Sequence, residues 1–219
     1  MAEEPIVETF PWKETADRFR QFQAACEGAI HVEDRALVAS EDGRRFVPPL
    51  LQPLREDEPL EDWLARAEQR DRRRLLVLVQ AGASSMGYWH GDELLAHKVI
   101  KKYVVRGKGK AQPTHLKTRG KSRYGSRLRL RNASAQLVQT NEKLLAWWDE
   151  HGPADDVFLS CPKRTVPELF ATEPAPPFAR DAALRIPLDV HVPDFEELKA
   201  VYRRMSRGRI EIYCDPSLG

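Results

Sequence analysis

The chain has 219 residues, enough for one domain with a full core or for one domain with a small appendage. Its 35 Lys and Arg residues nearly balance 33 Asp and Glu residues, so the net charge of +2 excludes a uniformly basic protein. Three distant cysteines, Cys26, Cys161 and Cys214, lack the spacing of a disulfide framework and fit a reducing cytoplasm.

Targeting, membrane and metal signals are also missing from the sequence. Residues 1–5 are acidic and lack an apolar core, so we expect no secretory signal. No apolar run approaches the roughly 20 residues of a membrane span. No Cys or His cluster has metal-ligand spacing. We therefore expect a cytoplasmic protein with no membrane partner, metal ion or other cofactor.

We expect residues 1–70 to form a small, mainly helical adaptor region. A helix is predicted from Glu14 to Cys26, because Phe19 and Phe22 share one face at helical spacing. A short strand at 35–39, a proline-rich link at 48–53 and a second helix at 60–70 complete this region.

Residues 71–219 have the pattern of a second, larger domain. Its first part contains three apolar segments, at 75–79, 85–90 and 94–105, that we interpret as strands. Because the links between them are too short for a helical crossover, these strands should form an antiparallel meander. A helix is predicted to begin at Asn132 and to end near Glu150.

The rest of this domain alternates short strands with helices. We predict a strand at 157–159, a helical turn at 167–170, a short strand at 185–188, a helix from Pro193 to Gly208 and a closing strand at 209–213. Asp155 and Asp156 follow a Gly-Pro turn, where we expect a solvated loop, with a pair of catalytic carboxylates as the alternative. The fold class is α/β in composition and α+β in arrangement, with helices packed on a mixed sheet.

The positive charge of the chain is concentrated in one segment. No Asp or Glu occurs from Leu94 to Asn141, and residues 98–131 hold 13 of the 35 Lys and Arg residues. The remainder of the chain has 22 basic and 33 acidic residues, so it is acidic. This division indicates a localised site for a polyanion.

Residues 106–131 have four glycines and one proline and no regular apolar pattern, so we expect a long loop. The candidate RNA-binding residues are Lys98, Lys101, Lys102, Arg106, Lys108, Lys117, Arg119, Lys121, Arg123, Arg127, Arg129 and Arg131. Phosphates would neutralise them with release of counterions, so binding should weaken steeply with salt. The alternative is a solvated basic face or a nonspecific tail.

One neutral residue in this loop can take part in chemistry. Gln112 lies within the run Gly109, Lys110, Ala111, Gln112, Pro113. A glutamine amide has no useful acid–base pKa, but it can orient a water or a hydroxyl, and its backbone N–H can meet an oxyanion. The alternative is that Gln112, like most loop glutamines, is merely solvated.

The run from Ala96 to Gln112 resembles the central motif of the Vms-type release-factor-like family, which includes ankyrin-repeat and zinc-finger peptidyl-tRNA hydrolases. The motif is a strand with His97, Lys98 and Tyr103 that leads into a small-residue loop ending in Gln. The similarity extends in order over residues 72–214. Its further matches are at 125–129, at 158–162, at 169–170 and at 186–187.

The resemblance implies a fold like the catalytic domain of eukaryotic and archaeal class I release factors. It implies a ribosome-associated peptidyl-tRNA release factor with the large ribosomal subunit, rRNA and peptidyl-tRNA as partners. Gln112 falls on the catalytic glutamine of the family, and Gly109, Lys110, Ala111 and Pro113 fall on its catalytic loop. The compact chain is expected to be a prokaryotic member that acts as a monomer.

Lys110 and Ala111 depart from the family pattern, because true release factors have two glycines at these positions. This departure leaves a non-catalytic, ribosome-associated RNA-binding factor as the alternative function. Within the family, the reaction is either hydrolysis of the peptidyl-tRNA ester or cleavage of the tRNA near its 3′ end. A free-standing RNA nuclease is the third reading, and it would cleave naked tRNA.

Overall fold

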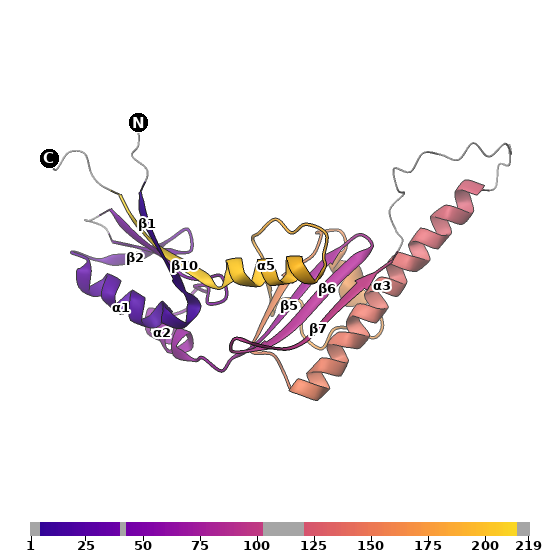
Figure 1. Ribbon diagram of the computed structural model, residues 1–219, viewed down its shortest axis with the longest axis horizontal. Coiled ribbons are helices and arrows are strands. Elements are labelled where there is room, and N and C mark those ends of the chain that lie inside the picture. The colour runs from indigo at the N-terminus through magenta and orange to yellow at the C-terminus, as the bar shows by residue number, and fades with distance from the viewer. Residues whose placement is uncertain (1–4, 40–42, 103–120, 214–219) are drawn as a thin grey trace. The chain divides into compact units, whose positions relative to one another are not determined.

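The computed structural model describes residues 5–39, 43–102 and 121–213, and within 121–129 it describes the backbone alone. Two five-stranded sheets with packed helices make up this part of the chain (Figure 1). The expected α+β fold class is therefore confirmed.

The chain forms two compact units, one of residues 1–71 with 200–219 and one of residues 72–199. The first unit contains β1 (Ile6–Pro11), the 3-10 helix η1 (Trp12–Glu14), α1 (Thr15–Ala25), β2 (Ile30–Glu33), β3 (Ala36–Ala39), β4 (Arg44–Val47), α2 (Leu60–Glu68) and β10 (Arg207–Ile212). Its sheet has the order β1-β10-β4-β3-β2, with antiparallel pairing throughout. The expectation of a mainly helical first region was wrong, because its short strands show little burial periodicity.

Aromatic rings from the helices and the sheet form the core of the first unit. Phe46 of β4 lies 5.1 Å from Phe10 of β1 and 5.4 Å from Phe19 of α1, between ring centroids. Trp63 of α2 packs edge-on to Phe19 and is fully buried. The helical face predicted for α1 is therefore the face that contacts the sheet.

Strand β10 belongs to the first unit although it is the last strand among the described residues. Its Gly208 pairs with Phe10 of β1, and its Ile210 pairs with Phe46 of β4. A Cβ at Gly208 would lie 2.4 Å from the Phe10 ring, so this close approach requires glycine. The sequence predicted a strand here but placed it in the wrong sheet, because the local pattern does not specify a strand's partner.

The second unit contains β5 (Arg73–Gln80), β6 (Ala83–His90), β7 (Glu93–Lys101), α3 (Lys121–His151), β8 (Asp156–Ser160), α4 (Val166–Ala171), β9 (Ala183–Arg185) and the first residues of α5 (Phe195–Met205). Its sheet has the order β7-β6-β5-β8-β9. Strands β5, β6 and β7 form the predicted antiparallel meander, whereas β8 runs parallel to β5 and β9.

Helices cover both faces of this second sheet (Figure 1). Leu137, Leu144 and Trp147 of α3 are buried against one face in a cluster that includes Val77 and Tyr88. The opposite face meets the start of α5, where Leu198 is fully buried. The sheet is thus the middle layer of the unit, and β7 is its edge strand.

Candidate functional site

The candidate site is the basic segment between β7 and α3. Gln112 lies outside the described residues. Eight other candidate site residues also lie outside them, namely Arg106, Lys108, Gly109, Lys110, Ala111, Pro113, Lys117 and Arg119. The structure describes the two elements that flank this segment, namely the end of β7 and the helix α3.

The basic residues of β7 stand at the first flank. Lys98 and Lys101 are exposed, and Lys102 is half-buried directly after the strand. Arg131, on α3, is exposed at the second flank. Both flanks of the segment therefore present cations to solvent.

The second flank differs from the expectation. Helix α3 begins at Lys121 rather than at Asn132, so residues 121–131 are helical and not part of a loop. The correction covers the backbone at Lys121, Arg123, Arg127, Arg129 and Arg131. Lys, Arg, Leu and Ser are acceptable or good helix formers, and the single Gly125 costs about 1 kcal/mol. Leu130 is 69% exposed, so it does not belong to a buried apolar stripe from which this part of the helix could have been predicted.

A buried glutamine connects the two flanks. Gln136 of α3 donates to the backbone oxygen of Gln80 at 2.9 Å and to the hydroxyl of Ser84 at 2.8 Å. Its side-chain oxygen accepts from the backbone N–H of Gly82 at 3.0 Å. The oxygen of Gly82 in turn accepts from the N–H of Lys102 at 2.8 Å. The turn between β5 and β6 therefore holds the end of β7 and α3 together.

A second buried amide fixes α3 further along. Asn141 donates to the backbone oxygens of Leu169 and Thr172 at 3.0 and 3.2 Å, at the end of α4. Asn141 is fully buried. Gln136 binds the turn between β5 and β6, and Asn141 binds the end of α4. Because these two contacts lie at different points along α3, they fix the axis of the helix relative to the sheet.

An ion pair at the far end of the sheet was missed by the sequence analysis. Arg72 donates to both carboxylate oxygens of Asp156, at 2.9 and 3.0 Å. Asp156 is 3% exposed, so the expectation of a solvated loop was wrong for this residue. Asp155 accepts from the N–H of Arg73 at 2.7 Å. The pair ties the start of β5 to the start of β8, two strands that lie side by side in the sheet.

The thiol of Cys161, which the structure describes, is not poised for catalysis. Burial, with a contribution from Glu168, raises the pKa of the Cys161 thiol to about 12, so this thiol is not a nucleophile near neutrality. The part of the chain that the structure describes contains no group of three His, Cys, Asp or Glu side chains arranged as metal ligands. In the same part, no helix is long and apolar enough to cross a membrane.

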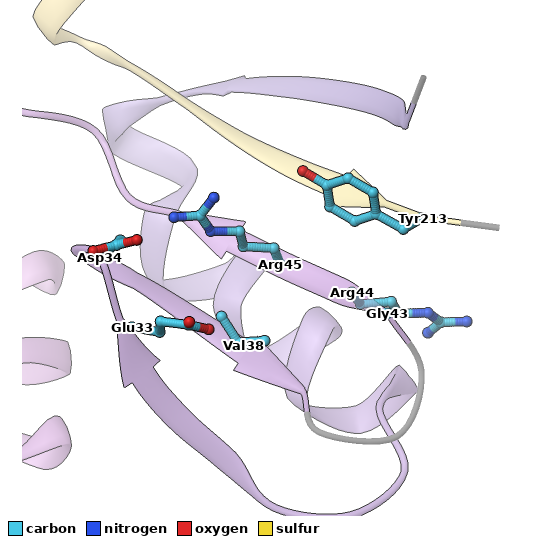
Figure 2. Close-up of a pocket in the computed structure, with 7 residues that line it drawn as sticks. All are labelled: Glu33, Asp34, Val38, Gly43, Arg44, Arg45 and Tyr213. Atoms are coloured by element: carbon cyan, nitrogen blue, oxygen red, sulfur yellow. The ribbon is translucent and has the colours of Figure 1, made fainter. Parts of the chain in front are cut away.

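A shallow pocket of about 250 Å³ lies in the first unit (Figure 2). Its lining residues are Glu33, Asp34, Val38, Gly43, Arg44, Arg45 and Tyr213. Figure 2 shows Arg44 pointing away from Arg45 and Tyr213. The pocket is smaller than ordinary ligand sites of roughly 300–1,000 Å³, and none of the sequence-predicted site residues lines it.

The fold defines the class of protein. The chain is similar in structure to the solved "Vms1 mitochondrial localization core", with a TM-score of 0.52 at 12% identity. The match covers 79% of this chain and 74% of that one. The structure is thus an α+β fold of the Vms1 core type, as the sequence motif implied.

The family follows from the sequence comparison. Residues 74–212 match the family model described as "Bacteroidetes VLRF1 release factor", and the chain belongs to this release-factor family. The bovine (Bos taurus) protein named "tRNA endonuclease ANKZF1" is 30% identical over 159 residues. That alignment covers 70% of this chain but 22% of the bovine protein, so the chain spans about a fifth of that relative. The predicted resemblance to Vms-type release-factor-like proteins is confirmed.

Proposed function

We propose that this protein is a ribosome-associated release factor that frees nascent chains from peptidyl-tRNA in ribosome rescue and quality control. It would act on the large ribosomal subunit in the cytoplasm as a monomer, with rRNA and peptidyl-tRNA as its partners. The observation that carries this proposal is the acid-free basic segment that contains Gln112, between β7 and α3 of a chain that belongs to a release-factor family.

The chemistry assigned to each part follows from residue type. Cations on β7 and α3 would bind RNA phosphates and so bring the segment to the acceptor end of the tRNA. Gln112 would then orient the attacking water through its amide, or the 2′-hydroxyl if the RNA itself is cut. The segment would work without a metal ion or a cofactor, and Gly109, Lys110, Ala111 and Pro113 would set the backbone around Gln112.

Purified stalled ribosomes that carry peptidyl-tRNA test this proposal. The wild-type protein and Gln112→Ala are compared with Gln139→Ala, which replaces an exposed glutamine of α3. We expect peptide release from the wild type and from Gln139→Ala, and a loss of at least about a hundredfold in rate for Gln112→Ala. Equal release by all three proteins would remove Gln112 from the mechanism.

Gel analysis of the tRNA 3′ end distinguishes the reactions. Ester hydrolysis leaves the tRNA intact, whereas endonuclease action, named for the bovine relative, shortens it. A non-catalytic RNA-binding factor remains the second candidate, favoured by Lys110 and Ala111 in place of two glycines. That candidate predicts ribosome binding with neither product. Cleavage of naked tRNA would indicate a free-standing nuclease.

A further inference from the structure

A paired set of rings and cations lies where the edge strand β7 meets the start of α5. The imidazole of His97 stacks on the ring of Phe195, with centroids 4.0 Å apart and planes 24° from parallel. The ammonium of Lys199 lies 4.6 Å from the centroid of the Phe195 ring. Lys101 lies four residues after His97 in β7, so both side chains are on the same face of the sheet. We name Lys101, His97, Phe195 and Lys199 the β7–α5 strip.

The packing beneath the strip holds its rings in place. Gly87 of β6 pairs with His97, and a Cβ at Gly87 would lie 3.0 Å from Leu198 of α5, so the helix approaches the sheet closely there. The hydroxyl of Ser85 donates to the backbone oxygen of Asp194 at 2.9 Å. The carboxylate of Asp194 accepts from the N–H of Glu197 at 2.9 Å and so caps the helix. Phe195 is therefore fixed before any ligand arrives.

The outer part of the strip is open to solvent and cationic. His97 and Lys101 are exposed, and the acid-free stretch from Leu94 to Asn141 includes both residues. Lys199 forms an ion pair of 2.8 Å with Glu196, whose side chain is 76% exposed. An exposed pair of this kind is weak, so a phosphate can compete with the carboxylate for Lys199.

Stacked flat rings with cations beside them match one polyanion, a single-stranded nucleic acid. Its bases have faces that stack on aromatic rings, and its phosphates bind ammonium groups. A duplex hides the faces of its bases, and an acidic peptide has charge but need not supply a flat ring. Lys101 and His97 are separated by four residues of strand, about 13 Å, which leaves room for a nucleotide to lie along the strand edge.

We infer that the β7–α5 strip binds unpaired RNA, with a base stacked on His97 and phosphates at Lys101 and Lys199. The choice of RNA rests on the proposed function, whereas the site itself rests on the contacts above. Phe195 supports the His97 ring from beneath, and Glu196 acts against binding because it holds Lys199.

Fluorescence anisotropy with the full chain tests the strip, with a labelled ten-nucleotide uridine RNA as the probe. His97→Ala should bind this RNA at least about fivefold more weakly than the wild type, because one stacked base is lost. His97→Phe should keep most of the affinity, because the phenyl ring can still stack on a base. His90→Ala, which replaces an exposed histidine of β6, is the matched control and should bind like the wild type. A blunt RNA duplex of the same length should not distinguish His97→Ala from the wild type.

Two charge variants give results of opposite sign. Glu196→Gln should bind the uridine RNA more tightly than the wild type, because it removes the carboxylate that competes with phosphate for Lys199, and a misfolded protein would not produce that gain. Lys199→Ala should lower the slope of log affinity against log salt by about 0.7. Unchanged binding by His97→Ala or by Glu196→Gln would overturn the inference. Competition by polyglutamate that is equally sensitive to His97→Ala would show an acidic-peptide site instead.

The outcome for the strip is separable from the outcome for the proposed function. If Gln112→Ala keeps full peptide release while His97→Ala binds RNA weakly, the mechanism fails and the strip stands. If release depends on Gln112 but RNA binding does not depend on His97, the strip fails and the mechanism stands.

Discussion

The side-chain amide of Gln136 donates to the backbone oxygen of Gln80 at 2.9 Å and so joins helix α3 to the turn that follows β5. Gln136 is 2% exposed, and its amide makes three hydrogen bonds to that turn and to Ser84. The same turn binds the N–H of Lys102. One buried side chain therefore fixes the spacing between the two flanks of the basic segment.

Gln136→Ala should destabilise the protein by about 2 kcal/mol, because it leaves the half-buried N–H of Gly82 and the buried hydroxyl of Ser84 without this partner. Urea unfolding measures the loss, with Gln139→Ala as a control at an exposed position of the same helix. Amide exchange at Gly82 and Lys102 should also become faster. Equal unfolding midpoints for the two variants would contradict the structural role of Gln136.

Asp156→Asn should cost about 3 kcal/mol or more, because it leaves Arg72 beside a neutral group at a site that is almost fully buried. Arg74, which is fully buried with its Nε 4.0 Å from Asp156, adds to the loss. The matched control is Asp149→Asn at an exposed position of α3. Unfolding followed by tryptophan fluorescence measures both variants, and a loss under about 1 kcal/mol for Asp156→Asn would show that the pair is not coupled to folding.

Glu58 should make the stability of the first unit depend on pH. Burial opposes its ionisation, but two hydrogen bonds from Arg66, of 2.8 and 2.6 Å, and the Arg66 charge lower the pKa below its ordinary value of 4.5. A lowered folded-state pKa means that this stabilisation is present above pH 4.5 and is lost as the pH falls through the lowered value. Urea unfolding between pH 7 and pH 3 should show a smaller acid-induced loss for Glu58→Gln than for the wild type. An identical pH dependence of the two proteins would exclude this contribution.

Sequence patterns predicted the elements that pack on a core. The strand at 75–79, the helical face of α1 and the meander of β5, β6 and β7 were correct, because burial selects apolar runs and apolar periodicity. Strand β10 was found but placed in the wrong sheet. Its pairing with Phe10 and Phe46 spans most of the chain, and no local pattern contains that information.

Buried polar residues were the other feature that could not be predicted from the sequence. Gln136, Asn141 and Asp156 look like surface residues in the sequence, because polar side chains are usually exposed. The structure shows each of them buried and hydrogen-bonded to elements distant in the sequence. Gln112 was chosen from its place in a family motif and lies outside the described residues, so its role stays a prediction.

The early start of α3 gives a direct test of the basic segment's second flank. Gly125 lies within the helix, where glycine costs about 1 kcal/mol relative to alanine. Gly125→Ala should therefore slow amide exchange across residues 121–131, by up to about fivefold. Gly125→Pro should have the opposite effect, because proline removes a helical hydrogen bond and clashes with the preceding turn. In a loop, neither substitution would change amide exchange across the whole of 121–131. Exchange rates equal to those of the wild type in both variants would therefore show that this stretch is the loop expected from composition.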